Sequence, residues 1–552
     1  MKDPRFPELN AKQLNTLKSY GKTLSIEERY LLFEPGQSNY NFYAILEGEI
    51  TVEDPSNNDE IIVKHQKNEF SGDNSMLSNR VAIFNGYAEK GSTILEIKPD
   101  RLKEAIAKHS DISDVLLNAF LLRQETVLDD IVGGIKLVGN ENSNKTYEIR
   151  DFMEKNHIWF HFIDVDKQEE ALELLAHFDV CKEDLPVLIA NNQTICKNPT
   201  IEEVARNTGV LSDFEDKIFD VLVVGAGPAG LAASVYAASE GLDCVTIDSN
   251  APGGQAGKSS KIENYLGFPT GISGGDLANR AYVQAQKFGC HISIPHRAKS
   301  IKRKGNHFIV EASNGKTIET KSIITATGAT YSRLPLQRLE HFEGSGIFYS
   351  ATGMNVSSCT DEIVGVVGGG NSAGQAAMFL SGFAKEVMVL LRGDDLGAKM
   401  SDYLVQRLEA KDNISIHLQT EVTQLHGNSH LEKLTITHSA DGPKEVDITN
   451  LFTFIGAKPC TDWIDDMVVT DPKGFIYTGS DIPQKAINRC AIYSNREPQP
   501  LETSVPGCFA VGDVRKGSVK RVAGAVGEGS VVVSQIHQYL GDIARLSYNK
   551  TS

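Results

Sequence analysis

The sequence predicts a multidomain α/β protein with two Rossmann-like nucleotide-binding domains, preceded by a β-rich jelly roll and a smaller α/β domain. A strand, a glycine turn and a helix follow one another within residues 220–239, and a second strand and glycine turn occupy residues 363–373. Short apolar runs separated by turn residues fill residues 30–65, which is typical of a jelly roll. A length of 552 residues agrees with several domains, because one core does not fill so long a chain.

The composition is that of a globular protein, with 41% hydrophobic and 23% charged residues. A net charge of −17 argues against a nucleic-acid partner, because phosphate backbones attract basic surfaces. The first residues contain no apolar signal segment, and the longest uncharged run, 221–239, is interrupted by Gly-x-Gly-Pro. We therefore expect a cytoplasmic protein without a membrane partner.

The cysteines do not form a recognisable redox or metal motif. Eight of them stand at positions 181, 196, 244, 290, 359, 460, 490 and 508, and no two form a C-x-x-C. No group of cysteines and histidines has the spacing of a zinc site, so we expect no metal. Such cysteines are typically small buried side chains or surface thiols in a reducing cytoplasm.

The first glycine turn, Gly225-x-Gly227-x-x-Gly230, has the pattern of a dinucleotide site. Gly225 permits the tight turn, Gly227 lets the backbone approach a pyrophosphate, and Gly230 lets the helix pack on the strand. The phosphates then meet free N–H groups at the positive end of the helix dipole. Asp248 follows the next strand, 244–247, near the offset of about 20 residues expected for a ribose-binding acid.

The N-terminal part begins with residues 1–24, which we expect to be helical, and continues with strands at 30–33, 43–46, 49–52 and 61–65 and helices at 102–109 and 115–128. The pattern Phe33-x-x-Gly36, followed by the apolar run 42–46 and Gly48, resembles the cyclic-nucleotide-binding domain family. In that family a Glu holds the ribose and an Arg the cyclic phosphate. The corresponding residues here are Asp73, after an inserted residue, and Arg80, at a shortened spacing. Ligand binding and a purely packing or regulatory role both remain open.

Residues 134–209 are predicted to form strand 135–138, helix 146–156, strand 159–165, helix 168–178 and strand 187–190. This order, with Leu185-Pro186 before the last strand, resembles the thioredoxin or glutaredoxin fold. Where that family has its C-x-x-C, this chain has the cysteine-free segment 139–143, and Cys181 has no partner at the needed offset. We therefore expect a docking or structural module without dithiol chemistry.

Further motifs follow the first glycine turn up to the C-terminus. They are Gly253-Gly254-Gln255, Ile262–Tyr265, a strand 323–326 leading to Thr327-Gly328-Ala329, the turn Gly368–Ala373, Thr453–Gly456 and Phe509–Asp513. Together they resemble the thioredoxin reductase family of two-nucleotide flavoproteins. The resemblance implies an FAD domain in two segments, an NAD(P)-binding domain inserted between them, and a homodimer. The implied division is 1–130, 131–214, 215–335 for the first FAD segment, 336–450 for the NAD(P) domain and 451–552 for the second FAD segment.

The resemblance also implies the residues that hold each cofactor. The FAD residues are Gly225, Gly227, Pro228, Ala229, Gly230, Asp248, Gly254, Gln255, Asn264, Thr327, Gly328, Gly512, Asp513, Arg521, Val522 and Ala523. Asp513 is expected at the ribityl chain and Ala523 near the flavin ring. The NAD(P) residues are Gly368, Gly370, Asn371, Ser372, Ala373, Arg392 and Lys399.

Arg392 follows the second turn at nearly the offset at which Asp248 follows the first. An acid at this position suits a free ribose 2′-hydroxyl, whereas an Arg can pair with a 2′-phosphate. The sequence therefore favours NADPH over NADH, with NADH still possible. The family usually has a second Arg directly after the first, where this chain has Gly393, and Lys399 is a candidate substitute.

The family's dithiol, which passes electrons from the flavin to a protein disulfide, is missing. Its position corresponds to residues 349–353, which contain no cysteine, and Cys359 nearby has no partner thiol. A dithiol relay needs two thiols within reach of each other. The hydride step from nicotinamide to flavin remains, because the cofactors supply that chemistry, and segments 334–342 and 448–452 correspond to the family's hinges.

The sequence does not identify the electron acceptor, which is either a small molecule or a redox protein. The main hypothesis is an NAD(P)H-dependent FAD oxidoreductase that resembles thioredoxin reductase. The alternatives are a reductase of ferredoxin or flavodoxin, which also lacks the dithiol, and a non-catalytic sensor of flavin or nucleotide.

Overall fold

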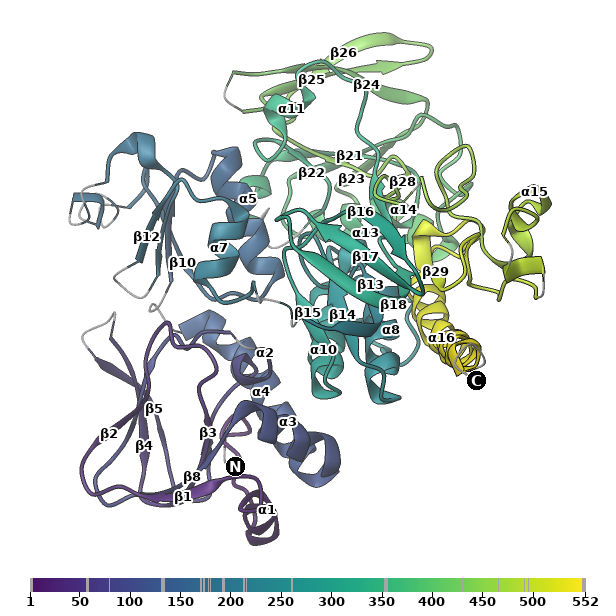
Figure 1. Cartoon of the computed structure of the whole chain (residues 1–552). Coiled ribbons are helices and arrows are strands. Elements are labelled where there is room, and N and C mark those ends of the chain that lie inside the picture. The colour runs from purple at the N-terminus through teal and green to yellow at the C-terminus, as the bar shows by residue number, and fades with distance from the viewer. Residues whose placement is uncertain are drawn as a thin grey trace.

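The computed structural model describes residues 3–548, apart from gaps at 56–58, 79, 131–134, 169–170, 172–173, 177, 179, 191–193, 212–213, 215, 260–261, 352–355, 429, 465, 491 and 495. Four sheet-based units follow one another along the chain (Figure 1). Among the described residues, no helix has the length and apolar character needed to cross a membrane.

The N-terminal β unit consists of two four-stranded antiparallel sheets, ordered β1-β8-β3-β6 and β2-β7-β4-β5. Its core is aromatic, with Phe70 packed against Phe42 and Phe120. The predicted N-terminal helix is confined to α1, because the chain from Lys22 onward pairs with β8. The elements are β1 (Lys22–Ser25), β2 (Tyr30–Phe33), β3 (Phe42–Glu47), β4 (Ile50–Asp54), β5 (Glu60–His65), β6 (Phe70–Ser71), β7 (Asn85–Ala88), β8 (Thr93–Ile97), α1 (Ala11–Leu17), α2 (Ser75–Ser78), α3 (Pro99–Lys108) and α4 (Ser110–Asp130).

The small α/β unit has a four-stranded sheet in the order β10-β9-β11-β12, in which only β9 and β10 are parallel. The Leu185–Pro186 peptide bond before β11 is cis. The helix expected at 168–178 lies partly outside the described residues. The elements are β9 (Lys136–Gly139), β10 (His161–Asp164), β11 (Val187–Ala190), β12 (Thr194–Lys197), α5 (Asn144–Lys155) and α7 (Ile201–Asn207).

The first nucleotide unit is built on a seven-stranded sheet in which β15, β14, β13, β18 and β29 run parallel. Helix α16 packs closely on α8, since a Cβ on Gly529 would lie 2.3 Å from the carbonyl oxygen of Ala229. The elements are β13 (Ile218–Val224), β14 (Cys244–Ile247), β15 (His291–Ser293), β16 (Ala298–Lys304), β17 (His307–Ala312), β18 (Thr317–Thr325), β29 (Cys508–Ala510), α8 (Pro228–Ser239), α9 (Gly254–Gly257), α10 (Gly274–Lys287), α15 (Gln484–Ile487) and α16 (Val522–Tyr548).

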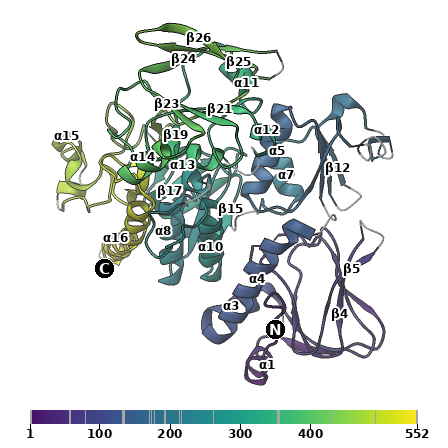
Figure 2. The ribbon, with the colours of Figure 1, turned by 180° about the vertical axis from the view of Figure 1, so that it is seen from behind.

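The second nucleotide unit has a five-stranded parallel sheet, β20-β27-β21-β22-β23, and a separate antiparallel sheet, β24-β25-β26, at its outer edge (Figures 1 and 2). The short pair β19–β28 joins the chain entering this unit to the chain leaving it. The elements are β19 (Ala329–Tyr331), β20 (Ile347–Phe348), β21 (Ile363–Val367), β22 (Glu386–Leu390), β23 (Ile414–His417), β24 (Thr420–His426), β25 (Lys433–His438), β26 (Gly442–Val446), β27 (Asn450–Thr453), β28 (Ala457–Pro459), α11 (Leu339–Phe342), α12 (Val356–Cys359), α13 (Asn371–Leu380) and α14 (Asp402–Glu409).

Candidate functional site

A cavity of about 1070 Å³ opens at the carboxyl ends of the parallel strands of the first nucleotide unit. The segments after β13, β14, β18 and β29 all contribute to its lining. This is the edge at which open α/β sheets bind ligands. The volume matches the upper range of small-molecule pockets, which run to about 1,000 Å³, so an extended dinucleotide fits.

The first glycine turn has the backbone that the sequence predicted. Gly225 has φ +107°, a left-handed conformation that disfavours any side chain. A Cβ on Gly230 would lie 1.8 Å from the Gly225 carbonyl oxygen, so only glycine lets α8 start here. A Cβ on Gly227 meets no atom nearer than the Gly254 Cα at 4.0 Å. Gly227 is the N-cap of α8, so unpaired N–H groups face a space left free for a phosphate.

The Asp248 carboxylate ties two loops of the cavity together. The Ala226 N–H donates to its Oδ2 at 2.7 Å, and the N–H groups of Asn250 and Ala251 donate to its Oδ1 at 2.9 and 3.3 Å. Burial raises the pKa of Asp248, while these backbone donors counteract the shift. Asp248 therefore shapes the turn itself, in addition to lining the cavity where a ribose was predicted.

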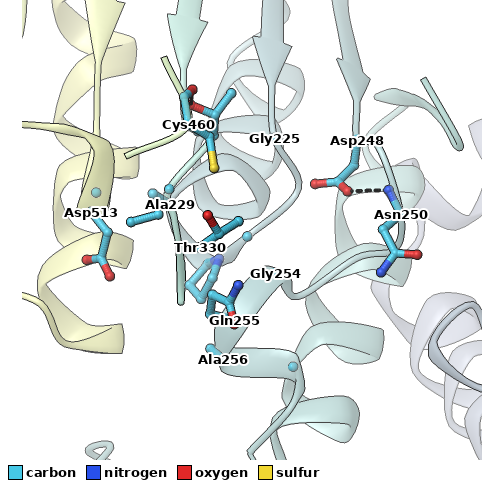
Figure 3. Close-up of a pocket in the computed structure, with 18 of the residues that line it drawn as sticks. Gly225, Ala229, Asp248, Asn250, Gly254, Gln255, Ala256, Thr330, Cys460 and Asp513 are labelled. Carbon is cyan, nitrogen blue, oxygen red and sulfur yellow. Dashed lines mark hydrogen bonds between the residues drawn. The ribbon is translucent and has the colours of Figure 1, made fainter. Parts of the chain in front are cut away.

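An aspartate stands on each side of the cavity. Figure 3 shows Asp513 on one side and Asp248 with Asn250 on the other, with Gln255, Thr330 and Cys460 between them. The Oε1 atom of Gln255 is buried and has no hydrogen-bond partner among the described residues. An unsatisfied buried acceptor in a polar cavity fits a ligand that donates a hydrogen bond.

Most of the predicted FAD residues line this cavity. These are Gly225, Gly227, Pro228, Ala229, Asp248, Gly254, Gln255, Asn264, Thr327, Gly328, Gly512, Asp513, Arg521 and Val522. Gly230 lies behind the turn, where it admits the helix. Ala523 is exposed and off the lining, whereas Val522 and Ala525 belong to it. Because α16 begins at Val522, positions three apart share a face and Ala523 points away.

The second glycine turn opens on the same cavity. Gly368 has φ +142°, and a Cβ there would lie 2.6 Å from the Phe454 carbonyl oxygen. Helix α13 begins at Asn371, and Asn371, Ser372 and Gln375 line the cavity. Gly370 and Ala373 flank this helix start without lining it. The first glycine turn and the start of α13, which follows the second glycine turn, therefore line one shared cavity.

Arg392 and Lys399 lie outside the cavity lining. The Arg392 side chain is 85% exposed and its Nε lies 3.8 Å from the Glu421 carboxylate. Lys399 is also exposed. Both stand on the segment after β22, beyond the part of the second turn that meets the cavity.

Cys359 lies within the core of the second nucleotide unit. It is fully buried, and burial raises its pKa to about 11. A buried thiol with a raised pKa is a poor nucleophile. Every cysteine of the chain is free, and residues 352–353 of the predicted dithiol position lie outside the described residues.

Several cavity residues were missed from the sequence. Asn250 donates to Asp248, Thr330 lies in β19, and the Cys460 carbonyl accepts a hydrogen bond of 2.7 Å from the Thr327 hydroxyl. Cys460 comes directly after β28, whose pairing with β19 brings it to the Thr327 turn. The motif at residues 453–456, shortly before Cys460, was the sequence signal that could have placed Cys460 near the cavity.

Comparisons with known proteins agree with this site. The family model for pyridine nucleotide-disulphide oxidoreductases matches residues 219–529, more than half of the chain. The chain belongs to this family. It is an NAD(P)H-dependent FAD oxidoreductase of the thioredoxin reductase-like type, and FAD and NADPH are the cofactors of that type. A second model, for the cyclic nucleotide-binding domain, matches residues 23–109.

Relatives and solved structures cover the second half of this oxidoreductase. The chain is 33% identical to the thioredoxin reductase of Mycoplasmopsis pulmonis over 324 residues, which is 57% of this chain and 96% of the relative. It is 28% identical over 331 residues to the thioredoxin reductase of Bacillus subtilis, covering 60% and 97%. The structure is similar to thioredoxin reductases from Lactococcus lactis (FR conformation; TM-score 0.52, 25% identity, 59% of this chain and 99% of that one) and T. acidophilum (TM-score 0.52, 28% identity, 59% and 100%).

Proposed function

We propose that this oxidoreductase passes hydride from NADPH to FAD inside the shared cavity and then delivers electrons directly from the flavin to an external acceptor. One observation carries this proposal: the first glycine turn and the start of helix α13, directly after the second glycine turn, line the same cavity. When both cofactors are bound, the nicotinamide supplies a hydride and the flavin accepts it. The chain's own residues bind and orient the cofactors and keep water out.

In this proposal the first turn holds the FAD pyrophosphate at the start of α8, and Asp513 lies at the ribityl chain. Burial raises the pKa of Asp513, with the Lys520 charge opposing the shift, so its carboxyl group is suited to hydrogen bonding within a closed site. The second turn holds the NADPH pyrophosphate, and Arg392 pairs with the 2′-phosphate. The division of the chain into 1–130, 131–214, 215–335, 336–450 and 451–552, and a homodimeric assembly, belong to the same proposal.

The path for electrons beyond the flavin does not use an internal dithiol. No cysteine occurs in residues 349–353. The neighbouring segment is covered by the small α/β unit, since the Tyr147 ring lies 5.5 Å from that of Phe348 and the Ser357 hydroxyl donates to Glu141 at 3.5 Å. A thiol protein therefore finds no cysteine relay in this segment, and the described residues Phe348 and Ser357 on either side contact the small α/β unit. A small molecule or a redox protein that reaches the flavin directly fits better.

The two N-terminal units have a supporting role in this proposal. The small α/β unit is a thioredoxin-like domain without its dithiol, as its strand order suggests. The N-terminal β unit is a cyclic-nucleotide-binding-like domain in which Arg80, the counterpart of the family's phosphate-binding arginine, contacts another unit. Arg80 donates to the backbone carbonyls of Asn156 and His157 at 2.6 and 3.0 Å, so it anchors the next unit instead of a phosphate.

Anaerobic stopped-flow absorbance with purified holoprotein tests the hydride step. We expect rapid bleaching of the flavin band on mixing with NADPH and slower bleaching with NADH. Absence of bleaching with either nucleotide, while FAD is demonstrably bound, would refute the enzyme proposal and favour a non-catalytic flavin sensor.

A reductase of ferredoxin or flavodoxin is the second candidate, and one observation favours it. Lys520 and Arg521 are exposed and line the cavity, while Lys516 stands on the same loop. Cations at the cavity opening suit an acidic redox protein. Reduction of ferredoxin or flavodoxin by the NADPH-treated enzyme, measured by absorbance at low and high salt, separates this candidate from a small-molecule reductase.

A further inference from the structure

One wall of the cavity comes from neither nucleotide unit. Glu154, Lys155 and His157, at the C-terminal end of α5 in the small α/β unit, line the same cavity as the first glycine turn. These residues are about 70 positions before that turn in the sequence, and no family motif includes them. The wall is therefore a contribution of the N-terminal half to the cofactor site.

This wall adjoins the Asp248 side of the cavity. The Asn156 side chain, which is buried, donates from Nδ2 to the Asn250 carbonyl oxygen at 2.8 Å. Asn250 in turn donates to Asp248. In a Rossmann unit the pyrophosphate lies at the glycine turn and the ribose at the acid after the second strand, so the space beyond that acid takes the adenosine. Asp513 lies on the other side of the cavity (Figure 3).

The wall is held in place by contacts with two other units. Arg80 of the N-terminal β unit binds the carbonyl groups of Asn156 and His157. His157 has φ +50°, so the chain turns sharply and presents its carbonyl to Arg80. One apolar cluster includes Phe152 of α5 together with Ile292 of the first nucleotide unit. A segment fixed in this way can serve as part of a preorganised binding site.

Two of the three wall side chains, those of His157 and Glu154, suit a nucleoside better than a phosphate, while the Lys155 ammonium forms an ion pair with Asp151 on the same helix. Burial and the Arg80 charge lower the pKa of His157 to about 4, which leaves a neutral imidazole with one donor and one acceptor. The Glu154 side chain is accessible from the cavity, yet desolvation raises its pKa to about 7, so a protonated carboxyl that can also donate is readily available. An adenine edge and ribose hydroxyls offer matching donors and acceptors.

We propose that Glu154, Lys155 and His157 form part of the FAD site and contact the adenosine half of the cofactor. Tight FAD binding then depends on the small α/β unit, because residues of that unit contact the cofactor. This inference rests on the proposed role of the cavity as the FAD site.

The test compares two flavins that differ only in the adenylate half. Apoprotein of the full chain is prepared by removing flavin in chaotropic salt, and FAD or FMN is titrated back while flavin fluorescence is followed. The variants are His157→Ala and Lys155→Ala. The matched control is Glu148→Ala, on an exposed position of the same helix. Circular dichroism melting of each apoprotein verifies its fold.

We expect the Kd for FAD to rise about tenfold in both wall variants and to stay unchanged in the control, a change that loss of one or two polar contacts produces. The Kd for FMN should be the same in all proteins. Unchanged FAD affinity in both folded variants, or an equal loss for FAD and FMN, would overturn the inference. If the wild-type apoprotein does not take up FAD at all, the proposed function fails as well, and the two failures are thereby distinguished.

Discussion

The two glycine turns of this molecule have the same backbone pattern, but the residues around them differ. Gly225 and Gly368 both adopt a left-handed conformation, and each precedes a helix that begins three residues later. After the first turn, Asp248 accepts three backbone hydrogen bonds within the cavity lining. After the second turn, the Arg392 side chain is 85% exposed and its Nε lies 3.8 Å from the Glu421 carboxylate.

We propose that the first turn holds a cofactor that stays bound and that the second turn holds a cofactor that exchanges during turnover. A turn whose acid is bonded to neighbouring loops and whose cavity is enclosed by several segments binds a ligand that stays. A turn followed only by exposed cations, here Arg392 and Lys399, is proposed to bind its ligand loosely enough to release it after each turnover. The substitutions below test whether the two turns are separable in this way.

The largest effect is expected from Gly230→Ala in the first turn. The added Cβ meets the Gly225 carbonyl oxygen at 1.8 Å, a backbone atom that cannot yield without moving the turn. Overpacking of this kind costs about 1–3 kcal/mol and removes the shape on which the phosphate depends. We expect purified protein without bound flavin, seen as loss of the visible absorbance band. A yellow, fully loaded variant would contradict the close packing.

The matched substitution in the second turn is Gly370→Ala. Gly370 has φ −106°, and a Cβ there meets no atom within 4 Å, so the fold tolerates it. The methyl group enters the space at the helix start where a pyrophosphate approaches. We expect full flavin content and a KM for NADPH raised about tenfold, in steady-state assays with an artificial acceptor. Reduced flavin content would show that the two turns are not separable.

Arg392→Ala should have a smaller and selective effect. Loss of a charge-assisted hydrogen bond to a 2′-phosphate costs about 1.5–3 kcal/mol when the site is protected, and less at an exposed position. Because the side chain is exposed, we expect kcat/KM for NADPH to fall about fivefold while that for NADH stays constant. The ratio of the two values, measured with the same preparation, is the readout. An equal loss for both nucleotides would remove Arg392 from the phosphate site.

The smallest effect is expected from Cys359→Ser. With a pKa of about 11, roughly one thiol in a thousand is ionised at pH 8, and the side chain is buried. Native protein should leave this thiol unmodified by iodoacetamide at pH 8, as mass spectrometry of peptides would show. Activity of the serine variant should remain within about twofold, because a buried inert thiol does not serve in catalysis. A larger loss of turnover would indicate that the Cys359 thiol takes part in electron transfer.

Local patterns predicted much of the fold. The strands before the glycine turns and the hairpins of the N-terminal β unit lie within a few residues of their predicted bounds, because apolar runs and turn residues encode them directly. The N-terminal residues were assigned wrongly in part. Lys22–Ser25 is polar and mostly exposed, and only its pairing with β8 makes it a strand.

The cavity residues were predictable where a single sequence motif contains the residue and also indicates its place in the fold, as for Asp248 and Gln255. They were not predictable where distant segments meet. His157 reaches the cavity through an interface between units, and such contacts leave no periodicity in the sequence. Val522, which was predicted, lines the wall together with Ala525, which was not, while Ala523 does not line it. The start of α16 decides which side chains face inward, and helix ends are difficult to locate from a sequence.

Helix α5 has a mechanical consequence. Its first turns pack through Tyr147 on the second nucleotide unit, and the residue after its end is bonded through Asn156 to the first. A helix of 12 residues is a stiff rod of about 18 Å. Any swing of one nucleotide unit about the segments near 334–342 and 448–452 must therefore detach one end of this rod. We infer that the small α/β unit opposes such a swing as long as both of these contacts are in place.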